Sequence, residues 1–195
     1  MRISKAQTQQ DDLLDPASTS WTSLTAESVS LTPVALDAQP NDYIKTAWAD
    51  RAYGKTTSAS ATAQQAGEKV YIRLEWNGER QPDAEFPDAA AVLLGSSDAI
   101  GTLGSEEQPL KMWYWADGRA EPQSLTTKGP GVFSTSGEDV LDAAALPGDG
   151  GWAVVIAGPL AALSSNQLGV VIWNGSNDER AGLAAVSEWL DLDTE

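Results

Sequence analysis

The chain has 195 residues, with 12 Lys and Arg against 28 Asp and Glu, and its formal net charge at pH 7 is −16. It contains no Cys and no His, which excludes disulfides, thiolate or imidazole metal sites and Ser-His-Asp catalysis. Hydrophobic residues make up 42%, so the chain can bury an ordinary globular core, whereas its charge disfavours binding to nucleic acid or to anionic membranes.

The first 20 residues are rich in Gln, Asp, Ser and Thr and show little hydrophobic periodicity. We expect residues 1–20 to form a flexible N-terminal arm and residues 21–195 to form one domain. The start of the chain lacks the apolar core of an export signal, and no run of 18 apolar residues occurs. We therefore expect no export signal and no membrane span, and the location stays open between the cytoplasm and the outer face of the membrane after export with a signal-bearing partner.

Seven short, largely apolar segments follow, and each is predicted to form a strand. Within 70–76 the apolar residues alternate with Arg73 and Glu75, which predicts one buried face and one solvated face. The segments 152–157 and 168–173 are apolar on both faces, which is typical of central strands covered on each side. The seven predicted strands span 28–36, 69–76, 89–94, 110–115, 152–157, 168–173 and 185–192.

Two short helices are predicted among these strands. One spans 137–146, where acidic residues and alanines suit a helix, and the other spans 159–163, where Pro159 suits a first helical position. Many short strands with little helix favour a mainly β fold, namely an antiparallel β-sandwich with one or two short helices.

Acidic residues are spread along the chain while Lys is scarce. In molar salt the screening length falls to about 3 Å, so the self-repulsion of such a surface is largely screened. The composition therefore indicates a halophilic protein.

Eight Trp residues occur in this short chain, and most of them are expected in the core because they lie within predicted strands. Trp113 and Trp115 share one face of their predicted strand, which leaves the alternative that they form a stacking platform for a flat ligand such as a sugar or a porphyrin. No set of residues supports an independent enzyme.

Six blocks in a fixed order carry a family resemblance. The most specific block closes the chain as Trp173-Asn174-Gly175, then Glu179-Arg180-x-Gly182, then Ser187-x-Trp189. With these blocks, the chain resembles the haem b-binding gamma subunit of type II DMSO-reductase-family molybdoenzymes, which include ethylbenzene dehydrogenase, dimethylsulfide dehydrogenase, and chlorate and selenate reductases. The other five blocks lie at 21–33, 70–76, 86–92, 109–117 and 152–155.

The resemblance implies a β-sandwich that holds haem b between a Met and a Lys and exchanges electrons with an iron–sulfur subunit. When the blocks are aligned, the Met position is occupied by Leu103 and the Lys position by Ala184, and neither side chain can ligate iron. An Arg expected shortly after the fifth block, within the strand that begins at Trp152, is replaced by Gly158. The resemblance with these departures implies a gamma-type subunit that lacks its haem.

The leading expectation is a non-catalytic, structural accessory subunit of a halophile's respiratory molybdoenzyme, such as a nitrate reductase-like complex, without a cofactor of its own. Its expected partners are a molybdenum catalytic subunit and an iron–sulfur subunit. One alternative is a haem b electron-transfer subunit in which Met112 serves as a substitute ligand. Another is a carbohydrate-binding β-sandwich that uses Trp113 and Trp115.

Overall fold

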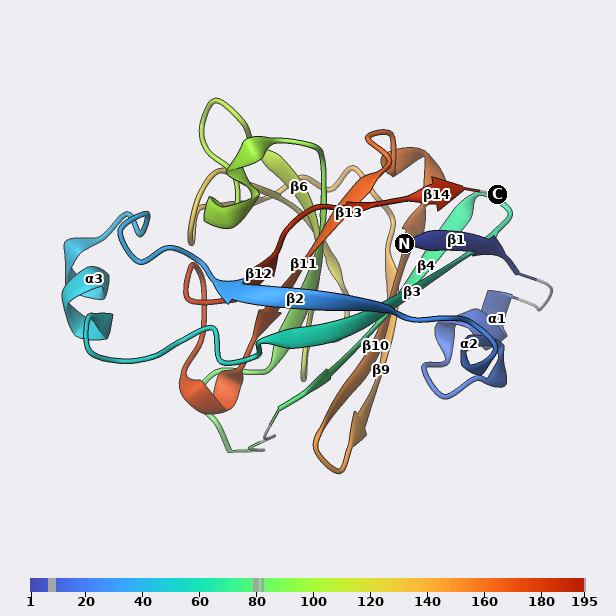
Figure 1. The fold of residues 1–195 in the computed structure, drawn as a ribbon, viewed down its shortest axis with the longest axis horizontal. Helices are drawn as coiled ribbons and strands as arrows, with labels where there is room; N and C mark the ends of the chain where they lie inside the picture. Colours follow the sequence, from blue (N-terminus) through green and yellow to red (C-terminus); the bar gives the residue numbers. More distant parts are fainter. Residues whose placement is uncertain (7–9, 79–80, 82, 195) are drawn as a thin grey trace.

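A computed structural model describes residues 1–6, 10–78, 81 and 83–194 (Figure 1). In this part of the chain, strands dominate and the three α-helices are short. The strands are β1 (Arg2–Lys5), β2 (Glu27–Pro33), β3 (Ser58–Ala66), β4 (Lys69–Asn77), β5 (Ala89–Leu94), β6 (Leu110–Ala116), β7 (Gln123–Thr127), β8 (Phe133–Thr135), β9 (Asp142–Gly148), β10 (Gly151–Pro159), β11 (Gln167–Trp173), β12 (Ala185–Ser187), β13 (Leu190–Asp191) and β14 (Asp193–Thr194). The helices are α1 (Gln10–Leu14), α2 (Thr19–Thr22) and α3 (Asp42–Trp48), and the 3-10 helices are η1 (Asp98–Thr102), η2 (Leu160–Ala162) and η3 (Gly175–Asn177).

The strands form two layers that are joined by β2 and also by the C-terminal segment β13–β14. Hydrogen-bonded neighbours follow the order β8-β7-β6-β5-β11-β12-β2-β3-β4-β10-β9, and every pair along this path is antiparallel. The first half of β2 pairs with β3 in one layer, which we call layer A, and its last residues pair with β12 in the other, layer B. The long β2 ribbon crosses between the layers in Figure 1. The prediction of a mainly β, antiparallel sandwich fold is confirmed.

The main core lies between the two layers. From layer A it takes alternate residues of β4 and β10, such as Ile72 and Ile156, and from layer B it takes alternate residues of β5, β6 and β11, such as Val92, Trp113 and Val170. Period-two alternation explains this assignment, because every second side chain of a strand faces the opposite layer.

Both layers are also covered on their outer faces, as the apolar character of 152–157 and 168–173 predicts. On layer A, α1 and α2 supply Leu13 and Trp21, which pack against Tyr71, Val155 and Ala157. On layer B, a second apolar cluster contains the remaining side chains of β5, β6 and β11. Figure 1 places α1 and α2 at one end of the molecule and α3 at the other.

The predicted helix at 137–146 is wrong. Residues from Asp142 onward form β9, which pairs along its whole length with β10 at the edge of layer A. Alanine favours a helix by only a fraction of a kcal/mol per residue, so a neighbouring strand with free hydrogen-bonding groups outweighs that preference. The second predicted helix corresponds to a single 3-10 turn, η2.

Ordered elements also occur within residues 1–20, the segment expected to form a flexible arm. Strand β1 pairs in parallel with β3 and β14, and α1 and the start of α2 follow it. The side chains of Ile3 and Leu13 are buried. Residues 7–9 of that segment lie outside the described residues.

Candidate functional site

The two positions that the family resemblance aligns with axial ligands lie in one buried apolar cluster. This outer-B cluster occupies the face of layer B that points away from layer A, and it includes Leu103, Met112 and Ala184, each fully buried. The fold therefore places both positions, and the candidate substitute ligand, on the same side of the same layer. The cluster consists of Val34, Ala89, Ala91, Leu93, Ile100, Leu103, Leu110, Met112, Ala116, Leu125, Val171, Trp173, Ala184 and Val186.

Hydrogen bonds to their backbone carbonyls hold these two positions against layer B. Leu103 follows η1 and adopts a left-handed conformation with φ of 56°, and its carbonyl accepts a 2.6 Å hydrogen bond from the Thr127 hydroxyl. Gly104 continues the turn with a positive φ, and a Cβ there would lie 2.7 Å from the Thr127 carbonyl oxygen. On the other side of the cluster, the Ala184 carbonyl accepts from the Val34 N–H at 2.9 Å. The segment that begins with η1 is therefore fixed over the sheet.

The side chains at these positions do not fit the Met and Lys ligands of a haem. Leu103 and Ala184 present only carbon, and the thioether of Met112 is the one sulfur in the outer-B cluster. Lys111 is engaged elsewhere, since its Nζ lies 3.2 Å from Glu138 and 3.3 Å from Asp139. Burial acts to lower the pKa of Lys111, but hydrogen bonds to the two carboxylates outweigh it and raise the pKa above its usual value. An amine held in its protonated form has no lone pair for iron.

Trp113 and Trp115 lie in the core between the layers rather than on the surface. The Trp113 ring is fully buried, and its Nε1 donates to Asp139 Oδ2 at 2.8 Å. Trp115 packs edge-on against Trp76 and Trp152, at centroid distances of 6.4 and 5.0 Å. A sugar platform needs an exposed ring face, and these rings present none.

The Trp113 ring also explains the glycine at the position where the resemblance leads one to expect an arginine. A Cβ at Gly158 would lie 2.6 Å from two atoms of the Trp113 ring and 2.8 Å from Leu141. A side chain at Gly158 is therefore incompatible with the position of Trp113. The departure at Gly158 is a packing requirement of this core.

The closing motif of the chain is held together by one buried carboxylate. Glu179 is 1% exposed, and its Oε1 accepts from the Lys55 backbone N–H and from Asn177 Nδ2, both at 3.0 Å. Its Oε2 accepts from the Asn174 backbone N–H at 2.9 Å. Glu179 thus joins the loop after β11 to the segment that precedes β3, and its place in the motif has a structural explanation.

Replacing Glu179 with Gln should lower the free energy of unfolding by about 2 kcal/mol, because an amide group places N–H donors where backbone donors now point. Chemical denaturation in high salt measures this loss. Glu188→Gln is the matched control, since it removes the same charge from an exposed side chain. Equal midpoints for the two variants would contradict the role assigned to Glu179.

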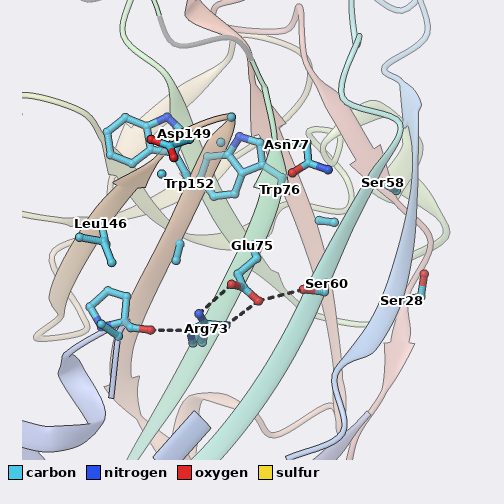
Figure 2. Close-up of a pocket in the computed structure, with 17 residues that line it drawn as sticks. Ser28, Ser58, Ser60, Arg73, Glu75, Trp76, Asn77, Leu146, Asp149 and Trp152 are labelled. Atoms are coloured by element: carbon cyan, nitrogen blue, oxygen red, sulfur yellow. Dashed lines mark hydrogen bonds and ion pairs between the residues drawn. The ribbon is translucent and has the colours of Figure 1, made fainter. Parts of the chain in front are cut away.

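A polar trough of about 660 Å³ lies on the outer face of layer A, beside the segment that joins α1 and α2. Figure 2 shows the network on its floor, in which Arg73 contacts Glu75 and Ser60 extends the chain of contacts. Arg73 Nε also donates to the Pro16 carbonyl at 2.8 Å. Hydrogen bonding from Arg73 holds the pKa of Glu75 below its usual value. The predicted outward face of 70–76 is confirmed at Arg73 and Glu75.

Besides Arg73 and Glu75, the polar lining of this trough includes Asn77 and Asp149. Arg73 and Glu75 satisfy each other, and the remaining polar lining is mainly small residues such as Ser28, Ser58 and Ser60. Among the described residues, no group of three or more acidic, His or Cys side chains is arranged to hold a metal ion.

Comparison with known proteins agrees with the resemblance noted in the sequence. No family model matches the chain. It is 30% identical over 141 residues to a protein of Haloferax mediterranei named as a respiratory nitrate reductase heme subunit, a match that covers 63% of this chain and 50% of the relative. It is 32% identical over 158 residues to the chlorate reductase subunit gamma of Ideonella dechloratans, which covers 70% of this chain and 65% of that subunit.

The chain thus spans about half of the first relative and just under two thirds of the second. Both relatives are named as subunits of reductases, in agreement with a gamma-type subunit. Within the described residues, no helix is both long and apolar enough to cross a membrane.

Proposed function

We propose that this chain is a non-catalytic, gamma-type accessory subunit of a respiratory molybdoenzyme of the nitrate or chlorate reductase kind. It assembles with a molybdenum catalytic subunit and an iron–sulfur subunit, and it does not hold haem b at the family's position. The names of the two relatives support the first part of this proposal.

The lack of iron-binding side chains at two positions of the outer-B cluster supports the second part of the proposal, that the chain does not hold haem b at the family's position. Leu103 and Ala184, which the resemblance aligns with the two axial ligands, are both fully buried among other apolar side chains. Haem iron in proteins is held by nitrogen, sulfur or oxygen donors, and neither side chain has one. The contribution of this subunit is then structural, in that it covers its iron–sulfur partner and stabilises the complex.

Met112 supports one alternative, a haem b subunit with a substitute ligand. Its sulfur is buried in the same cluster as Leu103 and Ala184. A single thioether supplies one axial bond, and no nitrogen donor stands at the second position. This alternative predicts that haem binding depends on Met112.

The test is isolation of the intact complex from the native host in molar salt, through an affinity tag on this chain. We expect molybdenum and iron–sulfur subunits to co-elute with it, and the dithionite-reduced eluate to lack a haem b α-band after correction for untagged material. If the chain were isolated without these partners, the proposal that it assembles with them would be overturned.

A haem b band in proportion to this chain would overturn the haem-free proposal. Met112→Leu then decides the ligand, because loss of the band in that variant establishes the substitute-ligand alternative. Met112→Leu nearly preserves side-chain volume, so it is expected to fold.

A further inference from the structure

A second cavity, of about 430 Å³, opens beside the outer-B cluster. Its apolar floor is formed by three aromatic rings of layer B, namely Tyr114, Phe133 and Trp173. Tyr114 and Trp173 meet edge to face at 5.6 Å between centroids, and Phe133 meets Trp173 in the same manner at 6.5 Å. Rings fixed against one another in this way form a preorganised surface for another aromatic ring. The volume lies within the usual range for small-molecule sites.

Two arginines, Arg119 and Arg180, line the same cavity. Arg180 is positioned by the Phe86 ring, which lies 4.1 Å from its guanidinium carbon, and by a 2.8 Å hydrogen bond from Nη1 to the Asp178 carbonyl. In the part of the chain that the structure describes, neither arginine has a carboxylate partner within ion-pair distance. Two uncompensated cations at one cavity stand out in a chain with a net charge of −16.

Among the described residues that line the cavity, the one acidic side chain already has hydrogen-bond partners. Glu179 uses both carboxylate oxygens to accept from Lys55, Asn174 and Asn177. Its carboxylate oxygens are therefore occupied within the loop that it holds, and Glu179 forms no ion pair with Arg119 or Arg180.

Tyr114 adds a polar group to the floor. Its hydroxyl has no hydrogen-bond partner among the described residues, although hydroxyls of half-buried tyrosines normally find one. Burial raises the pKa of Tyr114, and the opposing effect of nearby Arg119 is smaller. The hydroxyl is thus protonated at neutral pH and is able to donate.

We propose that this cavity binds a planar aromatic anion, such as an aromatic carboxylate or sulfonate. The ring of the ligand packs on Tyr114, Phe133 and Trp173, and its anionic group meets Arg119 and Arg180. Guanidinium groups recognise such oxyanions through paired charge-assisted hydrogen bonds. The rest of this acidic surface repels anions, so selective binding requires this local pair of arginines. The inference goes beyond the proposed function and does not depend on the fate of the haem.

The test uses two fluorescent probes that share an aromatic framework. 8-Anilinonaphthalene-1-sulfonate carries a sulfonate, and N-phenyl-1-naphthylamine is its neutral counterpart. We titrate both into the full chain in about 1 M KCl, where long-range charge effects are screened and direct contacts persist. We expect the sulfonate to bind more tightly than the neutral probe, with one site per chain.

The decisive variant is Arg119→Gln/Arg180→Gln, which changes two exposed side chains. We expect this double variant to lower the affinity for the sulfonate probe at least tenfold, equivalent to about 1.4 kcal/mol. The affinity for the neutral probe should stay unchanged. Lys5→Gln/Lys45→Gln removes the same charge from exposed or half-exposed positions elsewhere and should have no such effect. Near-ultraviolet circular dichroism checks that each variant keeps its tertiary structure, because partly folded proteins also bind the sulfonate probe.

Three results would overturn the proposal. These are equal affinities for the two probes in the wild-type chain, equal losses in the two double variants, or sulfonate binding that persists unchanged without the two arginines. Each result would show that probe binding depends on general apolar surface or on net charge rather than on this cavity.

Discussion

Replacing Trp113 with Ala should lower the free energy of unfolding by about 4 kcal/mol. The ring is fully buried between the layers, fills the space left free by Gly158, and donates to Asp139. Removing it leaves a large cavity lined by side chains of both layers. Denaturant titration followed by far-ultraviolet circular dichroism, in high salt, measures the loss.

Two variants make the result specific to Trp113. Trp113→Phe keeps an aromatic ring but removes the hydrogen bond to Asp139, and it should show an intermediate loss of about 2 kcal/mol. Tyr43→Ala removes a ring that is 79% exposed and should stay within about 0.5 kcal/mol of the wild type. If Trp113→Ala unfolded at the same denaturant concentration as Tyr43→Ala, the result would contradict the core position of the Trp113 ring.

Replacing Gly175 with Ala should lower the free energy of unfolding by about 3 kcal/mol. A Cβ at this position would lie 2.1 Å from the Phe86 carbonyl oxygen and 2.7 Å from the Pro87 carbonyl carbon. These are backbone atoms, so the clash cannot be relieved by a side-chain rotation. The loop after β11 would have to move away, and the hydrogen bond from the Gly175 N–H to Asp88 Oδ1, now 2.8 Å, would be strained.

The matched control for this change is Gly101→Ala, in η1. No atom lies within 4 Å of a Cβ built there, so the same added methyl group should be tolerated, within about 1 kcal/mol of the wild type. Thermal unfolding of the two variants side by side gives the comparison. A shift of equal size in both would show that close backbone approach at Gly175 is not the cause.

Hydrophobic patterning was sufficient to predict the central strands. The bounds of β5 agree with the predicted 89–94, and those of β4, β6, β10 and β11 differ by only one or two residues. These segments contain runs of large or β-branched apolar residues whose burial dominates the local energetics. Strand β3 was missed because Ser58–Ala66 is composed of Ser, Ala, Thr and Gln. It is a strand because of its neighbours β2 and β4.

The sequence was less informative about the sites. Alignment of motifs identified Leu103 and Ala184, but no local pattern could show that they share a buried cluster with Met112. The same is true of Arg119 and Arg180, which come from loops after different strands and meet only when layer B is assembled. The stacking-platform hypothesis for Trp113 and Trp115 used the correct periodicity, which places both rings on one face. It could not tell whether that face points to solvent or to a second layer.

Strand β2 gives the molecule a property that neither layer has alone. Residues Glu27–Ser30 form a ladder with β3, and Leu31–Pro33 form a ladder with β12. The two layers are therefore held by side-chain packing and also by hydrogen-bonded segments that cross between them. Besides β2, the C-terminal segment crosses, because β13 pairs with β11 of layer B and β14 pairs with β1, which pairs with β3 of layer A. The layers cannot slide past each other or separate unless both crossing segments break. A protein built this way responds to stress as a single cooperative unit, in which neither layer unfolds without the other.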